Sequence, residues 1–255
     1  PFMDFNLYYD WLYRVEGDDW PVIVPTGESG RYEPMAGIYK PSIAPLLQTA
    51  LAGEDVSLQH ALHIVGSVIT IDAVDYSHNL RNVNHIEDYL WARAEAVNAC
   101  RHVPIISVVS EKRKTGKTTV VTRLVSELQK IGVSVGVVKS DKHGFHMDYE
   151  GTDTDLAMNA GATAVAIAGP TETAVRIRTK EQSNLYDLTQ TLPVDLVILE
   201  TRSQGVFPII EIIRDGYTES LISSEIERVM TVDVTKLDEC IPELVCRIQG
   251  MMRDI

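Results

Sequence analysis

The sequence predicts an α/β protein in which residues 101–255 form a domain with a mostly parallel sheet, preceded by an incomplete α/β segment at 1–100. Three observations indicate this. Nearly continuous apolar runs recur through 101–255, as in strands that helices cover on both faces. Helical patterns separate several of these runs, which is the alternation of a parallel sheet. A basic turn at 111–119 joins one run directly to an amphipathic segment.

The first segment alternates helical and extended patterns up to a boundary near Arg101–Pro104. Apolar spacing and turn residues predict three helices and two strands. The helices are expected at 4–15, 41–53 and 85–99, and the strands at 20–25 and 67–74.

The second domain has the more regular alternation. Its strands are expected at 103–110, 133–140, 162–169, 194–200, 209–214 and 228–234. Apolar residues from Val120 to Ile131 follow helical spacing, and Gly132 suits the end of that helix. A short helix leading to Gly161 is expected to begin at Asp153 or Thr154, which are capping residue types. The last helix is expected at about 236–253.

Composition and charge narrow the classes of function. The net charge of −13 argues against general binding to nucleic acids or anionic membranes. No apolar run approaches the ~20 residues that span a bilayer, and the opening PFMDFNLYYDWLY lacks the pattern of a signal peptide. The three cysteines fit no metal site or disulfide framework, which indicates a reducing cytoplasm.

The turn at 111–119 resembles the phosphate-binding pattern G-x-x-x-x-G-K-[ST]. Gly116 lets the backbone approach phosphate oxygens, Lys117 reaches the β- and γ-phosphates, and the Thr118 hydroxyl suits Mg²⁺. Glu111 stands where the pattern has its first glycine, so a basic turn with a chance GKTT remains the alternative. Positive charge clustered at one turn of an acidic chain favours a phosphate site. We therefore predict a P-loop NTPase domain. The predicted nucleotide-binding residues are Lys112, Arg113, Lys114, Thr115, Gly116, Lys117, Thr118 and Thr119.

Acidic residues at the ends of other strands are expected to lie near the same turn and to bind Mg²⁺. Glu200 ends the run DLVILE, where ligands of open α/β sheets bind, and it is the predicted catalytic group. An exposed carboxylate at a strand end is the simpler interpretation. Thr118, Glu200 and Asp141 are the predicted Mg²⁺ ligands. His143 and His146 are weak evidence for another metal, because two loop histidines are commonly just solvated.

The element TKLD at 235–238 has two interpretations. It resembles the guanine-reading N/T-K-x-D element of some GTPases. Alternatively, it begins the last helix, with Thr235 as the cap and Asp238 near the positive end of the helix dipole. The second interpretation is favoured.

The motifs TGKTT, GVVKSDKHGFHMDYEGTDT, AGATAVAIA, DLVILE and IIEIIRDG, in this order, resemble the MobB family, molybdopterin-guanine dinucleotide biosynthesis protein B. The resemblance covers most of 103–255. It implies a homodimer that binds GTP in a P-loop fold, hydrolyses it weakly at best and assists MobA, the guanylyltransferase that joins GMP to molybdopterin. Two positions depart from the family pattern. They are Glu111 and the stretch LETRSQG, where a Glu-Gly-Phe-Lys-like stretch is usual.

The first segment resembles the second half of MobA, through VIVPTGESGRYEPMAGIYKPSIAPLL and NVNHIEDYLWA. Asn82 and Asn84 match the family's Asn-Val-Asn element, which implies a contact with molybdopterin; a turn that caps the following helix is the alternative. The chain therefore resembles a MobA–MobB fusion that begins inside the transferase module. Without the first half of that module, no guanylyltransferase activity is expected.

The expected function is that of a cytoplasmic GTP-binding accessory protein of molybdenum cofactor biosynthesis, with weak Mg²⁺-dependent GTP hydrolysis. Its expected partners are a MobA-type guanylyltransferase, molybdopterin or molybdoenzyme apoproteins, and a second copy of the chain. One alternative is a small-metabolite kinase, for which Arg176 and Arg178 are the only candidates for an arginine-rich lid. The other is an adapter between transferase and acceptor enzymes that does not hydrolyse nucleotide.

Overall fold

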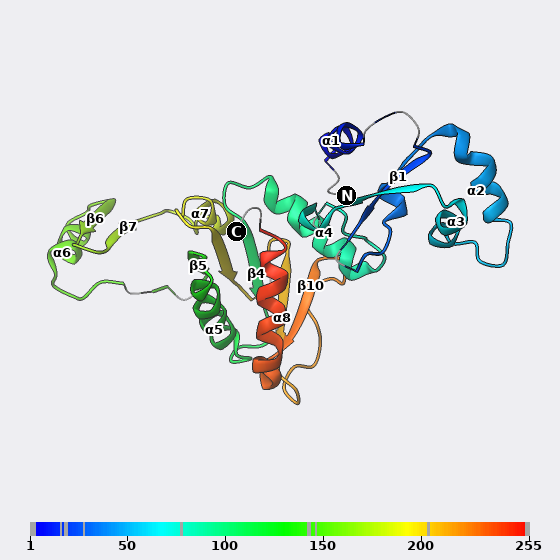
Figure 1. Ribbon diagram of the computed structural model, residues 1–255. Helices are drawn as coiled ribbons and strands as arrows, with labels where there is room; N and C mark the ends of the chain where they lie inside the picture. Colours follow the sequence, from blue (N-terminus) through cyan, green and yellow to red (C-terminus); the bar gives the residue numbers. More distant parts are fainter. Residues whose placement is uncertain are drawn as a thin grey trace. The chain divides into compact units, whose positions relative to one another are not determined.

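The computed structural model describes residues 4–15, 17, 20–27, 29–76, 79–141, 144–145, 147–202 and 205–252. The chain divides into two compact units, Pro1–Asn84 and His85–Ile255 (Figure 1). Helix α4 (Ile86–Ala99), expected in the first segment, belongs to the second unit. It packs there because Leu90, Trp91 and Ala94 are buried in that unit's main core.

The first unit contains a three-stranded sheet of order β2-β1-β3. Strand β1 (Val22–Thr26) pairs in parallel with β3 (Val68–Asp72) and antiparallel with β2 (Ile38–Tyr39). The helices, with short 3-10 turns among them, are α1 (Asn6–Arg14), η1 (Pro34–Ala36), η2 (Pro41–Ile43), α2 (Ala44–Ala50), α3 (Leu58–Val65) and η3 (Val74–Tyr76).

Most elements predicted for this unit are present, but the segment 41–66 differs. The predicted helix 41–53 begins as a 3-10 turn and ends at Ala50. Helix α3 was not predicted, although its sequence carries both end signals. The Ser57 hydroxyl accepts a hydrogen bond from the amide of His60, and Gly66 closes the helix with φ 73°.

The second unit is built on a five-stranded sheet of order β10-β9-β4-β8-β5. Every neighbouring pair in it is parallel, as the sequence predicted. Parallel pairing places the carboxyl ends of all five strands along one edge. The strands are β4 (Ile105–Val109), β5 (Val135–Lys139), β8 (Leu196–Glu200), β9 (Ile209–Ile213) and β10 (Arg228–Asp233).

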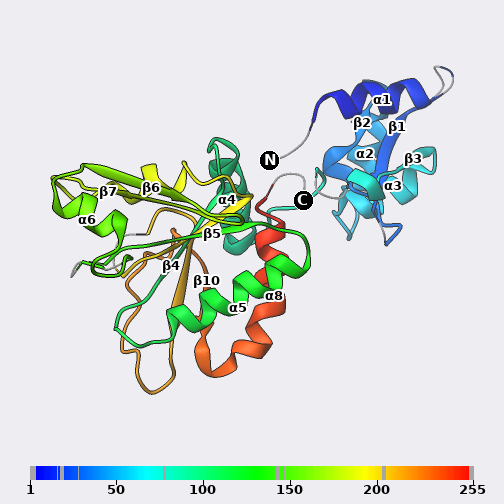
Figure 2. The same cartoon turned by 90° about the vertical axis from the view of Figure 1, so that its left-hand side faces the viewer.

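Helices cover both faces of this sheet. On one face, Ile106, Ile198 and Ile210 join a core with α4, α5 (Lys117–Lys130) and α8 (Leu237–Gln249). Helices α5 and α8 lie side by side in both views (Figures 1 and 2). On the other face, Ile105 and Val197 pack with a smaller cluster that includes residues of and around α7 (Leu185–Thr189). The continuous apolar runs therefore reflect burial on both sides.

The predicted strand 162–169 exists, but it is not part of the parallel sheet. It forms β6 (Ala164–Ala168), which pairs antiparallel with β7 (Thr173–Ile177) in a separate hairpin. Helix α6 (Asp153–Asn159) precedes the hairpin, and its cap is Thr152 rather than Asp153 or Thr154. The Thr152 hydroxyl accepts a hydrogen bond from the amide of Asp155.

The last helix begins differently from the prediction. A 3-10 turn, η4 (Val234–Lys236), precedes α8, and the carboxylate of Asp233 accepts a hydrogen bond from the amide of Thr235 at 3.0 Å. Thr235 is therefore not the cap, whereas Asp238 does lie in the first turn of α8. Within the described ranges, each helix is too short or too polar to traverse a bilayer.

Candidate functional site

The basic turn follows β4 and leads into α5. Its conformation depends on two residues with positive φ, Lys114 (61°) and Gly116 (116°). A side chain at Gly116 would also meet Val234, because a Cβ atom there would lie 2.9 Å from both Val234 methyl groups. The hydroxyls of Ser110 and Thr115 donate to the carbonyl of Lys112 at 2.9 and 2.8 Å. These two hydrogen bonds hold both ends of the turn to the same backbone carbonyl.

Lys117 begins α5 at the base of this loop. Its ammonium donates to the Ser110 hydroxyl at 2.7 Å, and Ser110 is completely buried. Burial lowers the pKa of Lys117, an effect that the nearby Glu200 carboxylate opposes. A lysine that is half-removed from water next to free backbone donors of a helix start is suited to hold an anion.

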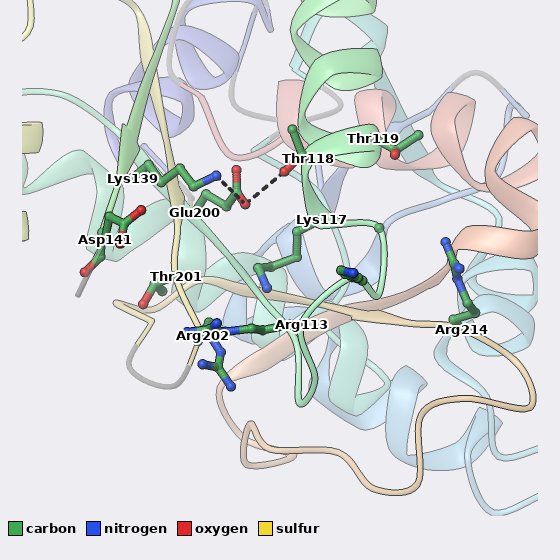
Figure 3. A pocket seen from close by; sticks show the side chains of 13 residues that line it. Arg113, Lys117, Thr118, Thr119, Lys139, Asp141, Glu200, Thr201, Arg202 and Arg214 are labelled. Atoms are coloured by element: carbon green, nitrogen blue, oxygen red, sulfur yellow. Dashed lines mark hydrogen bonds and ion pairs between the residues drawn. The ribbon is translucent and has the colours of Figure 1, made fainter. Parts of the chain in front are cut away.

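The carboxylate of Glu200 lies opposite the start of α5. Strand pairing brings it there, because Val108 and Lys139 are both register partners of Glu200. The Thr118 hydroxyl donates to Glu200 at 3.2 Å, and the Lys139 ammonium lies 3.7 Å from the same oxygen (Figure 3). Glu200 is only 7% exposed. It is therefore a buried, paired carboxylate and not the exposed strand-end group of the simpler interpretation.

These groups line one cavity of about 510 Å³ at the carboxyl edge of the sheet (Figure 3). Its walls come from the turn, the first residues of α5 and the ends of three other strands. The lining residues are Arg113, Lys114, Gly116, Lys117, Thr118, Thr119, Lys139, Ser140, Asp141, Glu200, Thr201, Arg202 and Arg214. Six of them are Lys or Arg and two are acidic, so the cavity is strongly positive in an acidic chain.

Two predicted nucleotide-binding residues do not line this cavity. The ammonium of Lys112 pairs with Glu219 and donates to the carbonyl of Tyr217 at 3.1 Å. The Thr115 side chain is buried and bonds within the turn. Arg113, Lys114, Gly116, Lys117, Thr118 and Thr119 do line the cavity, together with Asp141 and Glu200. Six of the eight predicted nucleotide-binding residues therefore line the cavity.

Sequence reasoning missed Arg202 and Arg214 as residues of this cavity, and it gave Lys139 no role. Each follows or ends a strand of the sheet, as Glu200 does. The rule that ligands bind beyond the carboxyl ends of parallel strands would have pointed to all of them.

The oxygen ligands at this edge fit Mg²⁺. The bond between Thr118 and Glu200 brings a hydroxyl and a carboxylate within reach of one ion, and Asp141 lines the same cavity. Mg²⁺ typically takes few protein ligands and completes its shell with waters and phosphate oxygens. Among the described residues there is no cluster of three or more His, Cys, Asp or Glu side chains suited to a metal ion. His143 and His146 lie outside the described residues.

The structure does not support two alternative assignments, the guanine-reading element and the kinase lid. Asp238 of the TKLD element lies 3.6 Å from Arg123 of α5 and does not line the cavity, so guanine reading by this element is not supported. Arg178 donates to the carbonyl of Met158 at 3.1 Å, and Arg176 lies 3.9 Å from Asp155. Both arginines are thus engaged within the α6–β7 segment and do not line the cavity as kinase lid residues would.

In the first unit, Asn82 lies beside a residue from the other resembling motif. Its side-chain amide donates to the carboxylate of Glu33 at 3.1 Å. Helix α4 begins after His85, whose amide donates to Asp88 at 3.0 Å. The helix cap therefore uses His85 and Asp88, and neither Asn82 nor Asn84 is the capping residue.

A protein-family model described as MobB, molybdopterin guanine dinucleotide synthesis protein B, matches residues 105–235, just over half of the chain. A relative from Bacillus subtilis (strain 168), named a probable molybdopterin-guanine dinucleotide biosynthesis adapter protein, is 33% identical over 119 residues, 45% of this chain and 68% of the relative. A Haemophilus influenzae protein named a molybdopterin-guanine dinucleotide biosynthesis adapter protein is 29% identical over 122 residues, 47% of this chain and 68% of its own.

Solved structures of similar proteins also match. A MobB protein homolog from Bacillus stearothermophilus is 20% identical, with a TM-score of 0.40 over 57% of this chain and 97% of that chain. Bacillus subtilis MobB is 18% identical, with a TM-score of 0.42 over 60% of this chain and 99% of that chain. The match of the family model and the identity to the Bacillus subtilis relative show that the chain belongs to the MobB family.

Proposed function

We propose that this chain binds Mg²⁺ and GTP in the cavity at the start of α5 and acts as an accessory protein of molybdopterin-guanine dinucleotide biosynthesis. One observation carries the proposal: Lys117, the Thr118–Glu200 pair and the Gly116 turn converge on a single positive cavity. A helix start with an adjacent lysine and a carboxylate is the usual arrangement for a nucleotide's terminal phosphates and their Mg²⁺. The names of the relatives support the pathway.

Each side chain has a distinct part in this proposal. The backbone amides around Gly116 and the Lys117 ammonium hold the β- and γ-phosphates. The Thr118 hydroxyl and the Glu200 carboxylate, with Asp141 as a further candidate, hold Mg²⁺ and its waters. Arg113, Lys114 and Arg202 add positive charge around the same phosphates. Bound Mg²⁺ would neutralise part of the phosphate charge.

Hydrolysis of GTP to GDP and phosphate is proposed to be weak. Catalysis of phosphoryl transfer depends mainly on positioning the attacking water and stabilising the charge of the transition state. Glu200 is the candidate for orienting that water, but its oxygen is already shared with Thr118 and Lys139. This sharing supports a tight binding site more than a fast hydrolase.

The decisive experiment is equilibrium binding of GTP, ATP and GDP with and without Mg²⁺, followed by hydrolysis assays on the same samples. The proposal expects GTP to bind more tightly than ATP, Mg²⁺ to strengthen binding, and turnover to be slow. Failure of every nucleotide to bind would contradict it. Rapid transfer of phosphate from ATP to a small metabolite would instead establish the kinase alternative.

The adapter alternative differs in its dependence on nucleotide. The names of the two relatives favour an adapter role. We propose that the chain contacts a MobA-type guanylyltransferase and molybdoenzyme apoproteins in the cytoplasm. If the transferase is captured equally well with and without GTP, the cavity is not a switch for docking and the adapter function stands independently.

A second copy of the chain is the proposed partner of the β6–β7 hairpin. One face of this hairpin carries Val175 and Ile177, which are 61% and 65% exposed, with alanines opposite them. Side chains on this face are uncharged, since it comprises Ala164, Ala166, Ala168, Thr173, Val175 and Ile177. An apolar face without charge is compatible with a two-fold contact between identical surfaces.

The first unit is proposed to be the second half of a MobA-like module. The contact between Asn82 and Glu33 supports this, because it joins the two motifs that carry the resemblance. Asn82 and Asn84 are the candidate contacts for molybdopterin. Binding of a pterin phosphate to the full chain with and without an Asn82→Ala substitution tests this assignment; equal binding would contradict it.

A further inference from the structure

Residues 214–224, between β9 and β10, form a segment without helix or strand that we call the strap. Backbone amides of an irregular segment that are not paired within it need acceptors from elsewhere in the chain or from water. Two carboxylates supply them. The amides of Glu219 and Ser220 donate to Glu111, and those of Ile222 and Ser223 donate to Glu211. The strap is therefore attached at two points along its length.

The two carboxylates differ in their surroundings. Glu211 is completely buried and also lies 3.5 Å from Arg228, so it anchors the end of the strap to the core. Glu111 belongs to the phosphate-binding turn and stands at the position of its missing first glycine. Strand pairing explains their proximity, because Val109, two residues before Glu111, is the register partner of Glu211.

The bonds at Glu111 are part of a wider connection between strap and turn. Its carboxylate accepts from the amide of Glu219 at 3.0 Å, and from the amide and hydroxyl of Ser220 at 3.4 and 3.1 Å. These bonds, led by the one from Glu219, lower the pKa of Glu111, so the carboxylate stays charged. Lys112 pairs with Glu219, and the Tyr217 hydroxyl donates to the carbonyl of Arg113 at 2.9 Å.

We propose that Glu111 is a positioning residue that fastens the strap to the phosphate-binding turn and so holds the turn in its binding conformation before a nucleotide arrives. This inference rests on the proposed function for its ligand, but not for the contact itself. A turn that is already ordered loses less conformational entropy on binding than a mobile one. This explains why a glutamate stands where the pattern usually has a glycine: the Glu111 side chain orders the turn by holding the strap against it.

An opposing effect has to be separated from this one. Removing a carboxylate near a phosphate site weakens repulsion, which would strengthen nucleotide binding. Glu111 does not line the cavity, whereas its hydrogen bonds connect directly to the turn. Loss of the strap contact should therefore dominate when Glu111 is replaced. It weakens GTP binding, whereas loss of charge repulsion strengthens it, so an affinity measurement separates the two.

The test compares Glu111→Gln and Glu111→Gly with the parent chain, and with Glu225→Gln as the control. The control removes one negative charge beyond the strap's end, where no bond to the turn is formed. Hydrogen exchange of the Glu219 and Ser220 amides is measured without nucleotide, and GTP binding is measured separately. Circular dichroism checks that each variant is folded. The glycine variant should lose protection at both amides and bind GTP about tenfold more weakly, or about 1.4 kcal/mol.

The glutamine variant should lie between parent and glycine variant in both measurements, because one amide oxygen still accepts a hydrogen bond. The control should match the parent. Unchanged exchange at Glu219 and Ser220 would overturn the attachment, and unchanged or stronger GTP binding despite faster exchange would overturn the positioning role. If the parent binds no GTP, the proposed function and the positioning role fail, and the exchange data still decide whether Glu111 holds the strap.

Discussion

The ammonium of Lys117 lies 2.7 Å from the hydroxyl of Ser110, a fully buried residue at the other end of the same turn. This contact fixes the lysine at the cavity while using only one of its three donors. Lys117→Ala should therefore weaken GTP binding by roughly 10- to 100-fold, the range expected for hydrogen bonds to a charged group. Isothermal calorimetry measures the change.

The control for this substitution is Lys130→Ala at the other end of the same helix. Lys130 pairs with Glu127 on the surface, at 2.8 Å. Removing it should leave GTP binding as in the parent. Equal affinities of the parent and Lys117→Ala would contradict the assignment of the site.

The charge of Lys117 should make GTP binding depend on pH. Burial lowers the pKa of this lysine below its ordinary value of 10.5, so the folded protein loses this charge earlier on the alkaline side than an exposed lysine would. Affinity should stay constant near neutral pH and fall as the pH rises through the lowered pKa. Bound phosphate favours the charged form, so binding in that range should take up protons.

The measurement is the GTP dissociation constant from neutral pH to about pH 10. Lys117→Ala provides the reference, because it lacks the titrating group and should show a flatter profile. Parallel profiles for the two proteins would assign the pH dependence to another group.

The bond between Thr118 and Glu200 should govern the response to Mg²⁺. Glu200→Gln removes a charge from the predicted metal shell, so it should reduce the gain in GTP affinity that Mg²⁺ produces by about tenfold or more. Without Mg²⁺, the same variant should bind GTP at least as tightly as the parent, since repulsion between carboxylate and phosphate is lost.

Titrations in Mg²⁺ and in a chelator separate these effects. Thr118→Ala should share the loss of the Mg²⁺ response, and Thr122→Ala, an exposed threonine one turn further along α5, should not. A Glu200→Gln variant with an unchanged Mg²⁺ response would remove this residue from the metal site.

Gly116 should be required for stability as well as for binding. A side chain at its φ of 116° is strained, and its Cβ would lie 2.9 Å from Val234. Gly132→Ala supplies the matched control, because its φ is 86° but no atom lies within 4 Å of its Cβ position. Gly132→Ala should lower the free energy of unfolding by roughly 1–2 kcal/mol through backbone strain alone.

Gly116→Ala should lower it further, by roughly another 1–3 kcal/mol for overpacking. Chemical denaturation of both variants measures the difference. Adding Val234→Ala to Gly116→Ala should recover part of the second contribution. If both glycine variants unfold at the same denaturant concentration, the contact with Val234 is unimportant.

The exposed face of the hairpin should determine the oligomeric state. Val175→Asp places a charge at the centre of this apolar face and should shift the protein from dimer to monomer in sedimentation analysis, because burying an unpaired charge is unfavourable. Thr171→Asp introduces the same charge at the hairpin turn and should leave the dimer intact. A parent chain that sediments as a monomer would contradict the proposed contact.

Local patterns predicted the parallel sheet because its central strands β4, β8 and β9 are buried along nearly their whole length and are therefore mostly apolar. The same rule failed for 162–169. That run is equally apolar, yet it forms an exposed hairpin with β7, and an apolar run does not by itself distinguish a strand buried within a sheet from an exposed one. Helix α3 was missed although Ser57 and Gly66 mark its ends.

By itself, the sequence determined where the basic turn between strand and helix lies, that Lys117 and Thr118 follow it, and that an acidic residue ends β8. Adjacent residues and strand-end positions carry these signals. Only the tertiary structure decided that Arg202 and Arg214 line the same cavity, that Lys112 turns away from it, and that Glu111 holds the strap. The physical reason is strand order. Contacts among the ends of β4, β5, β8 and β9 depend on which strands are neighbours, and no local pattern records that arrangement.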